Sequence, residues 1–170
     1  MGMNERLGQA DLVVYGQIGD MSELPSDTST AVLLNYTLNV LCVMKKEAGI
    51  KQSIGNSIVI HEEYPTIACY SNRHYVVKGR KIVAMLSERS GQTGFYFDNI
   101  NIQGAVFLGN QSTFDKITVC AGINNHIGSE CPQIANSSVT CSTASMPSSY
   151  SISLLSFVFL TIMSLYQLLC

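Results

Sequence analysis

The alternation of apolar and polar side chains along this chain predicts β-strands. The longest example runs from Thr30 to Met44, where apolar residues fall at every second position from Leu34 to Val40. Asn35, Thr37 and Asn39 occupy the positions between them. A period of two is typical of a strand with one buried face. We therefore expect the side chain of Asn35 to point away from the core.

Seven other short runs are rich in β-branched or aromatic residues and end at turn residues. They are residues 11–18, 57–60, 76–77, 81–86, 95–97, 99–103 and 114–120. Residues 21–27 and 45–56 carry Gly, Pro or polar side chains and are predicted to be loops. No part of this body has the periodicity of an amphipathic helix. The pattern predicts an all-β fold, namely an antiparallel barrel that is closed or partly open, with a sandwich as the alternative.

The composition of the chain divides it into three parts. Residues 10–122 form the predicted barrel domain. Residues 123–153 are rich in Ser and Asn and predict a flexible stalk and spacer, and residues 154–170 form a hydrophobic segment. No Asp, Glu, Lys or Arg follows Glu130.

This C-terminal pattern is typical of a glycosylphosphatidylinositol (GPI) attachment signal. Such a signal has small residues at the attachment site, then a polar spacer and a hydrophobic tail. Ser142, Thr143 and Ala144 are the best small-residue triplet, with residues 145–153 as the spacer. We expect attachment at Ser142, and the triplet that begins at Asn136 is a second candidate.

Two other interpretations of the tail stay open. Residues 152–169 would span about 27 Å as a helix, at roughly 1.5 Å per residue, which approaches the thickness of a thin bilayer. A retained membrane helix normally has Lys or Arg on its cytoplasmic flank, and only Cys170 follows Leu169. A buried core helix is the third possibility, although the segment has no polar face.

The predicted anchor raises a question about the start of the chain. A lipid anchor is attached in the lumen of the secretory pathway, and Met1 to Leu7 lead into no apolar stretch that could act as a signal peptide. We expect that this sequence lacks its true N-terminus. The alternative is that the tail itself inserts after translation.

Cysteines and glycosylation sequons support passage through the secretory pathway. If Cys170 leaves with the tail, five of the six cysteines remain, and Cys141 beside the attachment site is the natural spare thiol. The other four allow three pairings, among which sequence does not choose. These disulfide candidates are Cys42, Cys69, Cys120 and Cys131, and the sequons begin at Asn35, Asn110 and Asn136. Dispersed cysteines with sequons are typical of extracellular proteins.

Charge gives no reason to expect nucleic acid as a partner. The net charge is −2, and the basic residues cluster only at Lys45–Lys46 and at residues 78–81. We interpret each cluster as a solvated turn rather than a phosphate site.

Motifs for catalysis or metal binding are missing from the sequence. His61-Glu62-Glu63 lacks the second His of a zinc-protease helix, and no Gly-x-Ser-x-Gly elbow or phosphate loop occurs. We interpret Glu62, Glu63 and Asp98 as solvated loop carboxylates. The aromatic run 95–97 is interpreted as core and edge packing rather than a ligand platform. The sequence therefore predicts a protein that is not an enzyme and needs no metal or cofactor.

The order of these features resembles a known family. The segments that carry the resemblance are Tyr36 to Cys42, Ile58 to Ile60, Cys69, Val77 to Lys81, Ile82 to Leu86, Gly94 to Tyr96, Asn101 to Phe107 and Val119–Cys120. Over residues 10–122 the chain resembles the secreted vein beta-barrel family, which includes the secreted coiled-coil-domain proteins. More distantly it is similar to netrin-like modules and tissue inhibitors of metalloproteinases. The resemblance implies an OB-like, netrin-like barrel.

The chain departs from these relatives in two respects. It has no heptads after the barrel, where the coiled-coil members continue into a coiled coil. Metalloproteinase inhibitors of this type use an N-terminal cysteine to reach the catalytic zinc, whereas the first cysteine in this chain is Cys42, inside a predicted strand.

These features together predict a non-enzymatic binding module on the outer face of the cell membrane, held by a GPI anchor. Its partner would be an extracellular protein or matrix ligand. One alternative is a netrin-like regulator of extracellular proteases or growth factors, as the resemblance implies. The other is a tail-anchored single-pass membrane protein.

Overall fold

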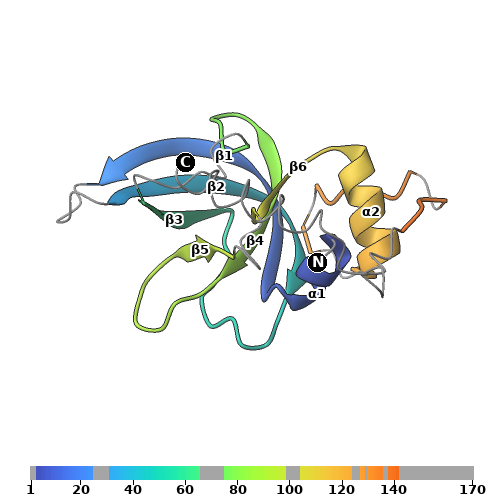
Figure 1. Cartoon of the computed structure of the whole chain (residues 1–170), viewed down its shortest axis with the longest axis horizontal. Coiled ribbons are helices and arrows are strands. Elements are labelled where there is room, and N and C mark those ends of the chain that lie inside the picture. Colours follow the sequence, from blue (N-terminus) through green and yellow to red (C-terminus); the bar gives the residue numbers. More distant parts are fainter. Residues whose placement is uncertain are drawn as a thin grey trace, which may run out of the picture.

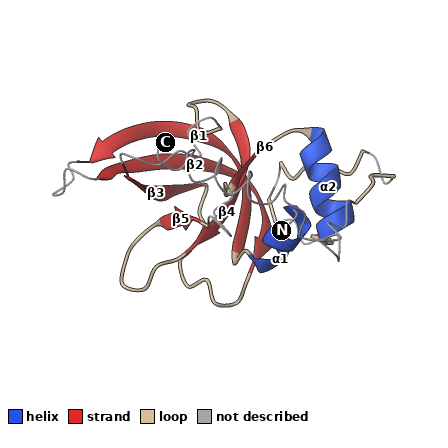
Figure 2. Cartoon of the chain, viewed as in Figure 1, coloured by secondary structure: helices blue, strands red, loops and turns tan. Residues whose placement is uncertain are grey.

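The computed structural model describes residues 3–24, 31–65, 75–98, 104–123, 127–128, 130–135 and 138–141. Within these ranges the chain forms strands gathered into a barrel, with helices at one end of it (Figures 1 and 2). The elements are α1 (Met3–Gln9), β1 (Leu12–Leu24), β2 (Ala31–Lys46), β3 (Ser57–Pro65), β4 (Lys81–Ser87), β5 (Phe95–Phe97), β6 (Val106–Leu108) and α2 (Gln111–Ala121).

Five strands close the barrel. They are hydrogen-bonded in the order β1-β2-β3-β5-β4, and β4 pairs with β1 to complete the ring. The prediction of a closed, mostly β barrel is confirmed. Its antiparallel character is confirmed only in part, because β3 and β5 run parallel at Ile60↔Phe95 and His61↔Tyr96. The barrel is therefore mixed.

The remaining strand, β6, lies outside the ring and continues the line of β5. Leu86 of β4 pairs with Phe97 of β5, and Ala84 pairs with Val106 of β6. Between these pairs the backbone of Met85 bonds to both Asp98 and Ala105. β1 pairs with the other edge of β4. The strands β5 and β6 therefore share one edge of β4 and form a single interrupted strand along it.

The strand boundaries differ from the predicted ones at several places. β1 continues through Leu24 into the predicted loop at 21–27, and β3 extends beyond residue 60 to Pro65. Both extensions are backbone pairings with β2, whose long alternating run offers partners along its whole length. The predicted strand at 76–77 is wrong, because Val77 and Arg80 close a turn there. Residues 99–103 lie outside the described part.

The alternation predicted for β2 is confirmed. Tyr36 and Leu38 are buried inside the barrel. Asn39, on the opposite face of the strand, is exposed. In β4, by contrast, five consecutive residues from Ile82 to Leu86 are buried. One face of β4 fills the barrel, and the other lies under further parts of the chain. Such continuous burial is typical of a strand covered on both faces.

The prediction of a strand at residues 114–120 is wrong, because this segment is in helix α2. Asn110 caps the helix start, where its side chain accepts a hydrogen bond from the backbone N–H of Thr113 at 2.9 Å. Gly122 ends the helix in the left-handed conformation, at φ 65°. The residues of α2 that face the core are Phe114, Asp115, Ile117 and Thr118. The ring of Phe114 meets Tyr15 of β1 edge-on, with centroids 4.8 Å apart.

Helix α1 was not predicted either, and Lys45 holds it in place. The Lys45 ammonium donates hydrogen bonds to the carbonyls of Gly8 at 2.8 Å and Ala10 at 2.7 Å. These carbonyls lie at the C-terminus of α1, where a cation is favoured. Lys45 lies in β2 with a side chain only 19% exposed, so its interpretation as a solvated turn is wrong. The cluster at 78–81 does lie in a turn, at Gly79.

We predict that Lys45→Met will lower the free energy of unfolding by about 1–2 kcal/mol, because the carbonyls at the C-terminus of α1 lose a charged donor. The matched control is Lys46→Met, since Lys46 is the next residue of β2 and its side chain is exposed. Urea unfolding followed by circular dichroism measures both variants. Equal losses in the two variants would contradict a specific role for Lys45.

The C-terminal segment is fastened to the domain as far as Cys141. The carboxylate of Asp115 accepts a hydrogen bond from the backbone of Ala135 at 3.0 Å, and the side chain of Gln111 donates to the carbonyl of Gln133 at 2.8 Å. These residues belong to the region that was predicted to be a flexible stalk. The rest of that stalk, from residue 142, and the hydrophobic segment lie outside the described residues.

Two disulfides occur within the described residues. Cys42 bonds to Cys131, and Cys120 bonds to Cys141. The prediction that Cys141 is a spare thiol is therefore wrong, because Cys141 is bonded to Cys120 in the last turn of α2. Cys69, the other disulfide candidate, lies outside the described residues. So do Asn136, Ser142 and Cys170.

In the described part of the chain, no helix is long and apolar enough to cross a membrane.

Candidate functional site

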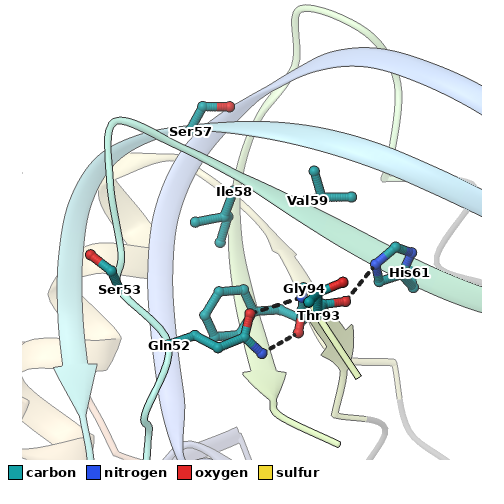
Figure 3. Close-up of a pocket in the computed structure, with 9 residues that line it drawn as sticks. Gln52, Ser53, Ser57, Ile58, Val59, His61, Thr93 and Gly94 are labelled. Atoms are coloured by element: carbon teal, nitrogen blue, oxygen red, sulfur yellow. Dashed lines mark hydrogen bonds between the residues drawn. The ribbon is translucent and has the colours of Figure 1, made fainter. Parts of the chain in front are cut away.

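Two hollows lie side by side at the surface of the barrel, one on each side of His61. The first has a volume of about 320 Å³ and is bordered by the β2–β3 loop, β3 and the β4–β5 loop (Figure 3). The second has a volume of about 250 Å³ and is bordered by β2, β3, the β4–β5 loop and β5. We call these the first and the second hollow. His61 lines both, so it lies at the centre of the candidate site.

The position of His61 follows from the register of three strands. It pairs across β3 with Asn35 of β2, and in parallel with Tyr96 of β5. Its ring nitrogen Nδ1 lies 2.5 Å from Asn35 Oδ1, and Nε2 lies 2.9 Å from the carbonyl oxygen of Thr93. The imidazole thus connects β2 to the β4–β5 loop.

Tyr96 and Arg89 form the wall of the second hollow next to His61. The rings of His61 and Tyr96 are 5.3 Å apart, and the guanidinium of Arg89 lies 4.0 Å from the centroid of Tyr96. A cation over an aromatic face is attractive at this distance. Phe95 and Phe97 are buried, which confirms the packing interpretation for these two. Tyr96 between them faces outward and lines the hollow.

Hydrogen bonds from side chains to the backbone connect the β2–β3 loop to the β4–β5 loop beside the first hollow. The amide of Gln52 donates to the carbonyl of Gly94 at 2.7 Å and accepts from its N–H at 2.8 Å (Figure 3). The carboxylate of Glu88 accepts from the backbone N–H groups of Lys51 at 3.0 Å and Gln52 at 2.5 Å. The site is therefore built on connected loops.

At Gly94 the β4–β5 loop lies close against β3. The φ of Gly94 is +89°, and an added Cβ would overlap the ring of His61, lying 2.7 Å from Cδ2. Only glycine takes this conformation without strain and leaves room for the imidazole. Figure 3 shows Gly94 and Thr93 directly against His61.

Glu62 is buried and lines the second hollow, so its interpretation as a solvated loop carboxylate is wrong. It follows His61 in β3, and its side chain therefore points into the barrel. There it accepts a hydrogen bond of 2.7 Å from the hydroxyl of Tyr36. A buried carboxylate is tolerated when such donors satisfy it. The side chain of Glu63 lies outside the described residues.

Asp98 also differs from a solvated carboxylate, because it is half-buried at the end of β5. Burial raises the pKa of Asp98 above its usual 3.8, and the nearby charge of Asp11 raises it further. The folded protein therefore binds a proton at Asp98 more readily than the unfolded chain does. The stability contributed by Asp98 rises as the pH falls toward 3.8 and is lost above the raised pKa.

We predict that Asp98→Asn will raise the Tm at pH 7 by roughly 1–3 °C, since the cost of charging a half-buried group disappears. The gain should shrink as the pH falls from the raised pKa toward 3.8 and should be absent below 3.8, where the wild-type carboxyl is neutral in both states. Asp20→Asn is the control of opposite sign, because exposed Lys78 lowers the pKa of Asp20. A gain from Asp98→Asn that is equal at all pH values would contradict this explanation.

The chemistry of the site is that of recognition by hydrogen bonds and ring contacts. Its groups are an imidazole, a phenol, a guanidinium, amides, hydroxyls and the buried carboxylate of Glu62, on a closed barrel. Among the described residues, no three His, Cys, Asp or Glu side chains gather as metal ligands would.

The structure brings only some of the predicted site residues together. Asn35 lies at the second hollow, whereas Asn110 caps α2 and is exposed there. Gln52 and Arg89 were missed, because loop residues that meet through tertiary contacts leave no periodic signal in sequence. The Asn35–His61 contact could have been found only from the register of β2 against β3.

A further hollow, of about 880 Å³, lies at the other end of β2. It is bordered by residues 43–47, Gly8, Ile127 and the C-terminal end of α2 around Gly122. This end also carries the Cys120–Cys141 disulfide. The Lys45 ammonium at this hollow already donates hydrogen bonds to the carbonyls of α1. We therefore consider the His61 site the better candidate for binding a ligand.

No known family model matches this chain, and no curated protein matches it. What the protein does must therefore be inferred from the residues and contacts described above.

Proposed function

We propose that this protein is a non-enzymatic binding module on the extracellular face of the cell membrane, tethered by a GPI anchor at Ser142. The observation that carries the proposal is the Cys120–Cys141 disulfide. It fastens the chain to the last turn of α2 one residue before the candidate attachment site. An anchor at Ser142 would then hold the folded domain directly, with its helical end toward the membrane.

The disulfides also support an oxidising compartment. Disulfides form and persist in secreted and cell-surface proteins and are rare in the cytosol. Both bonds connect the C-terminal segment to the domain, one to β2 at Cys42 and one to α2 at Cys120. That segment leads to the proposed anchor.

The strand order supports an OB-type barrel. The ring β1-β2-β3-β5-β4-β1 with parallel β3 and β5 is the order of OB-type barrels, which is the netrin-like architecture that the sequence resembles. Barrels of this type bind oligonucleotides and oligosaccharides on the face of strands 2 and 3 and at the loops between strands 1 and 2 and between strands 4 and 5. The His61 site occupies that face and the β4–β5 loop. We propose it as the surface for an extracellular protein or matrix ligand.

The position of the site is consistent with an anchored module. Asn35 lies in the first third of β2 and pairs with His61 in the middle of β3, whereas Lys45 near the end of β2 contacts α1 and Cys141 is bonded to α2. With the anchor at Ser142, the His61 site would face away from the membrane and would be open to ligands.

The anchor is tested by expressing the chain behind a cleavable signal peptide and treating intact cells with phosphatidylinositol-specific phospholipase C. We expect the protein to be released, and a chain that stops after Cys141 to be secreted without treatment. Retention on the cells together with resistance to alkaline carbonate would overturn the anchor and favour the single-pass alternative. Binding of the released protein to a panel of extracellular proteins and matrix components then tests the module.

The strand order, together with the netrin-like resemblance of the sequence, favours one second candidate, a regulator of extracellular proteases or growth factors. Cys42 is buried and bonded to Cys131, so it offers no ligand to a protease zinc. Regulation would have to act through another surface. Failure of the purified protein to inhibit a metalloproteinase panel would remove the protease part of this candidate.

A further inference from the structure

Asn35, the acceptor residue of the first sequon, lines the second hollow of the His61 site. We propose that Asn35 carries an N-glycan whose first N-acetylglucosamine is seated in this hollow and holds the β4–β5 loop against β2. The inference rests on the proposed function, because N-glycans are added only in the secretory pathway.

The side chain of Asn35 is oriented for this attachment. Its Oδ1 is used by the contact of 2.5 Å with His61 Nδ1, and the sugar is attached to the other amide atom, Nδ2. Asn35 is half-buried and borders the hollow. The glycosidic bond would therefore start at the rim of the hollow, and the His61 contact fixes the direction in which it leaves.

The hollow offers the chemistry that a sugar ring requires. Its volume of about 250 Å³ is of the size of one monosaccharide. Tyr96 and His61 provide ring surface, against which the C–H groups of a pyranose pack, and Leu33 provides an apolar patch. Arg89 and Gln92 are exposed at its border and can donate hydrogen bonds to hydroxyl and acetamido oxygens.

The sequon at Asn110 provides an internal contrast. Asn110 is exposed, and its Oδ1 accepts hydrogen bonds from the backbone and the hydroxyl of Thr113. A glycan on Asn110 would leave the N-cap of α2 toward solvent, as most surface glycans do. Only the Asn35 glycan is expected to affect the β4–β5 loop.

A seated sugar would also divide the proposed binding surface. It would fill the second hollow and leave the first one, between Gln52 and Val59, open to a partner (Figure 3). The glycan would thus set the border of the ligand site.

The test uses trypsin cleavage after Arg89 as a readout of the loop. Thr37→Val removes the sequon but keeps Asn35 and His61, and Thr37→Ser keeps the sequon. Ser112→Ala removes only the Asn110 sequon. We expect cleavage after Arg89 to be at least about five-fold slower in the wild type, Thr37→Ser and Ser112→Ala than in Thr37→Val, because a seated sugar opposes local opening.

Trimming with endoglycosidase H, which leaves a single N-acetylglucosamine, separates a seated first sugar from shielding by the whole glycan. We expect trimmed wild type, made with high-mannose glycans, to keep its protection. Loss of protection on trimming, or equal cleavage of Thr37→Val and wild type, would overturn the inference. So would a glycan on Asn110 with none on Asn35. The absence of glycans from both residues would count against the proposed function itself.

Discussion

Replacing Cys42 and Cys131 together by alanine is expected to lower the free energy of unfolding by about 4–5 kcal/mol. The bond joins residues that are 89 apart in sequence, so its loss releases a long loop in the unfolded chain. The chain-entropy relation for a loop of this length gives that magnitude. Because a domain of this size has about 5–15 kcal/mol of stability, much of the margin would be lost.

The matched control is the double substitution of Cys120 and Cys141 by alanine. These residues are only 21 apart, so the same relation gives a smaller loss of about 3 kcal/mol. Cys42 is also fully buried in β2, whereas Cys141 is exposed. The two pairs therefore differ both in the loop that they close and in their burial.

Urea unfolding of the two double variants, with the same probe and the same m-value analysis, measures the difference. The Cys120/Cys141 variant should keep the barrel and lose the covalent attachment of residue 141 to α2. Its far-ultraviolet spectrum at low urea should match the wild type. A larger loss for the Cys120/Cys141 pair than for the Cys42/Cys131 pair would show that neither loop length nor burial sets the contribution of each disulfide.

The barrel could be predicted from the sequence because β2 buries one face and other strands carry dense apolar or β-branched runs. Tyr36 and Leu38 of β2 alternate with Thr37 and Asn39 in the sequence. In the fold the first two side chains are buried and the other two are more exposed. The same reasoning found β4 and β5, whose apolar residues are dense. The closure through β1 and β4 and the parallel pairing of β3 with β5 depend on contacts between distant strands, which period alone does not encode.

Helix α2 was missed because its residues have β propensity. Phe114, Ile117 and Thr118 are β-branched or aromatic, and the segment has the pattern of a strand when it is considered alone. What decides the helix is tertiary packing of Phe114 on Tyr15 together with the cap at Asn110 and the left-handed Gly122. The caps were visible in the sequence, and they were the signal that could have found the helix.

Buried charges were missed for a related reason. Lys45 and Glu62 are placed in strands, where charged residues usually face solvent. Each instead meets partners from other elements, which are the carbonyls of α1 for Lys45 and the Tyr36 hydroxyl for Glu62. The pairing of Cys120 with Cys141 likewise accompanies contacts of Gln133 and Ala135 with α2. Sequence patterns do not contain these contacts.

Replacing Gly94 by alanine is expected to lower the free energy of unfolding by about 3–4 kcal/mol and to open the His61 site. Two physical effects add. A residue with a side chain at φ +89° is strained, and the new Cβ would overlap the imidazole of His61. To relieve the overlap, His61 must give up its contacts with Asn35 and Thr93, or the loop must leave the Gln52 amide.

Gly91→Ala in the same loop separates these two effects. Gly91 also has a positive φ, of +78°, but an added Cβ there would meet nothing within 4 Å. This variant should lose only about 1 kcal/mol, the cost of the strained backbone. The chemical shifts of the His61 ring should move in Gly94→Ala and stay unchanged in Gly91→Ala. Equal losses of stability in the two variants, with unchanged chemical shifts of the His61 ring, would mean that glycine is needed at position 94 only because of its backbone conformation. The imidazole would then not be held by the close approach of the loop.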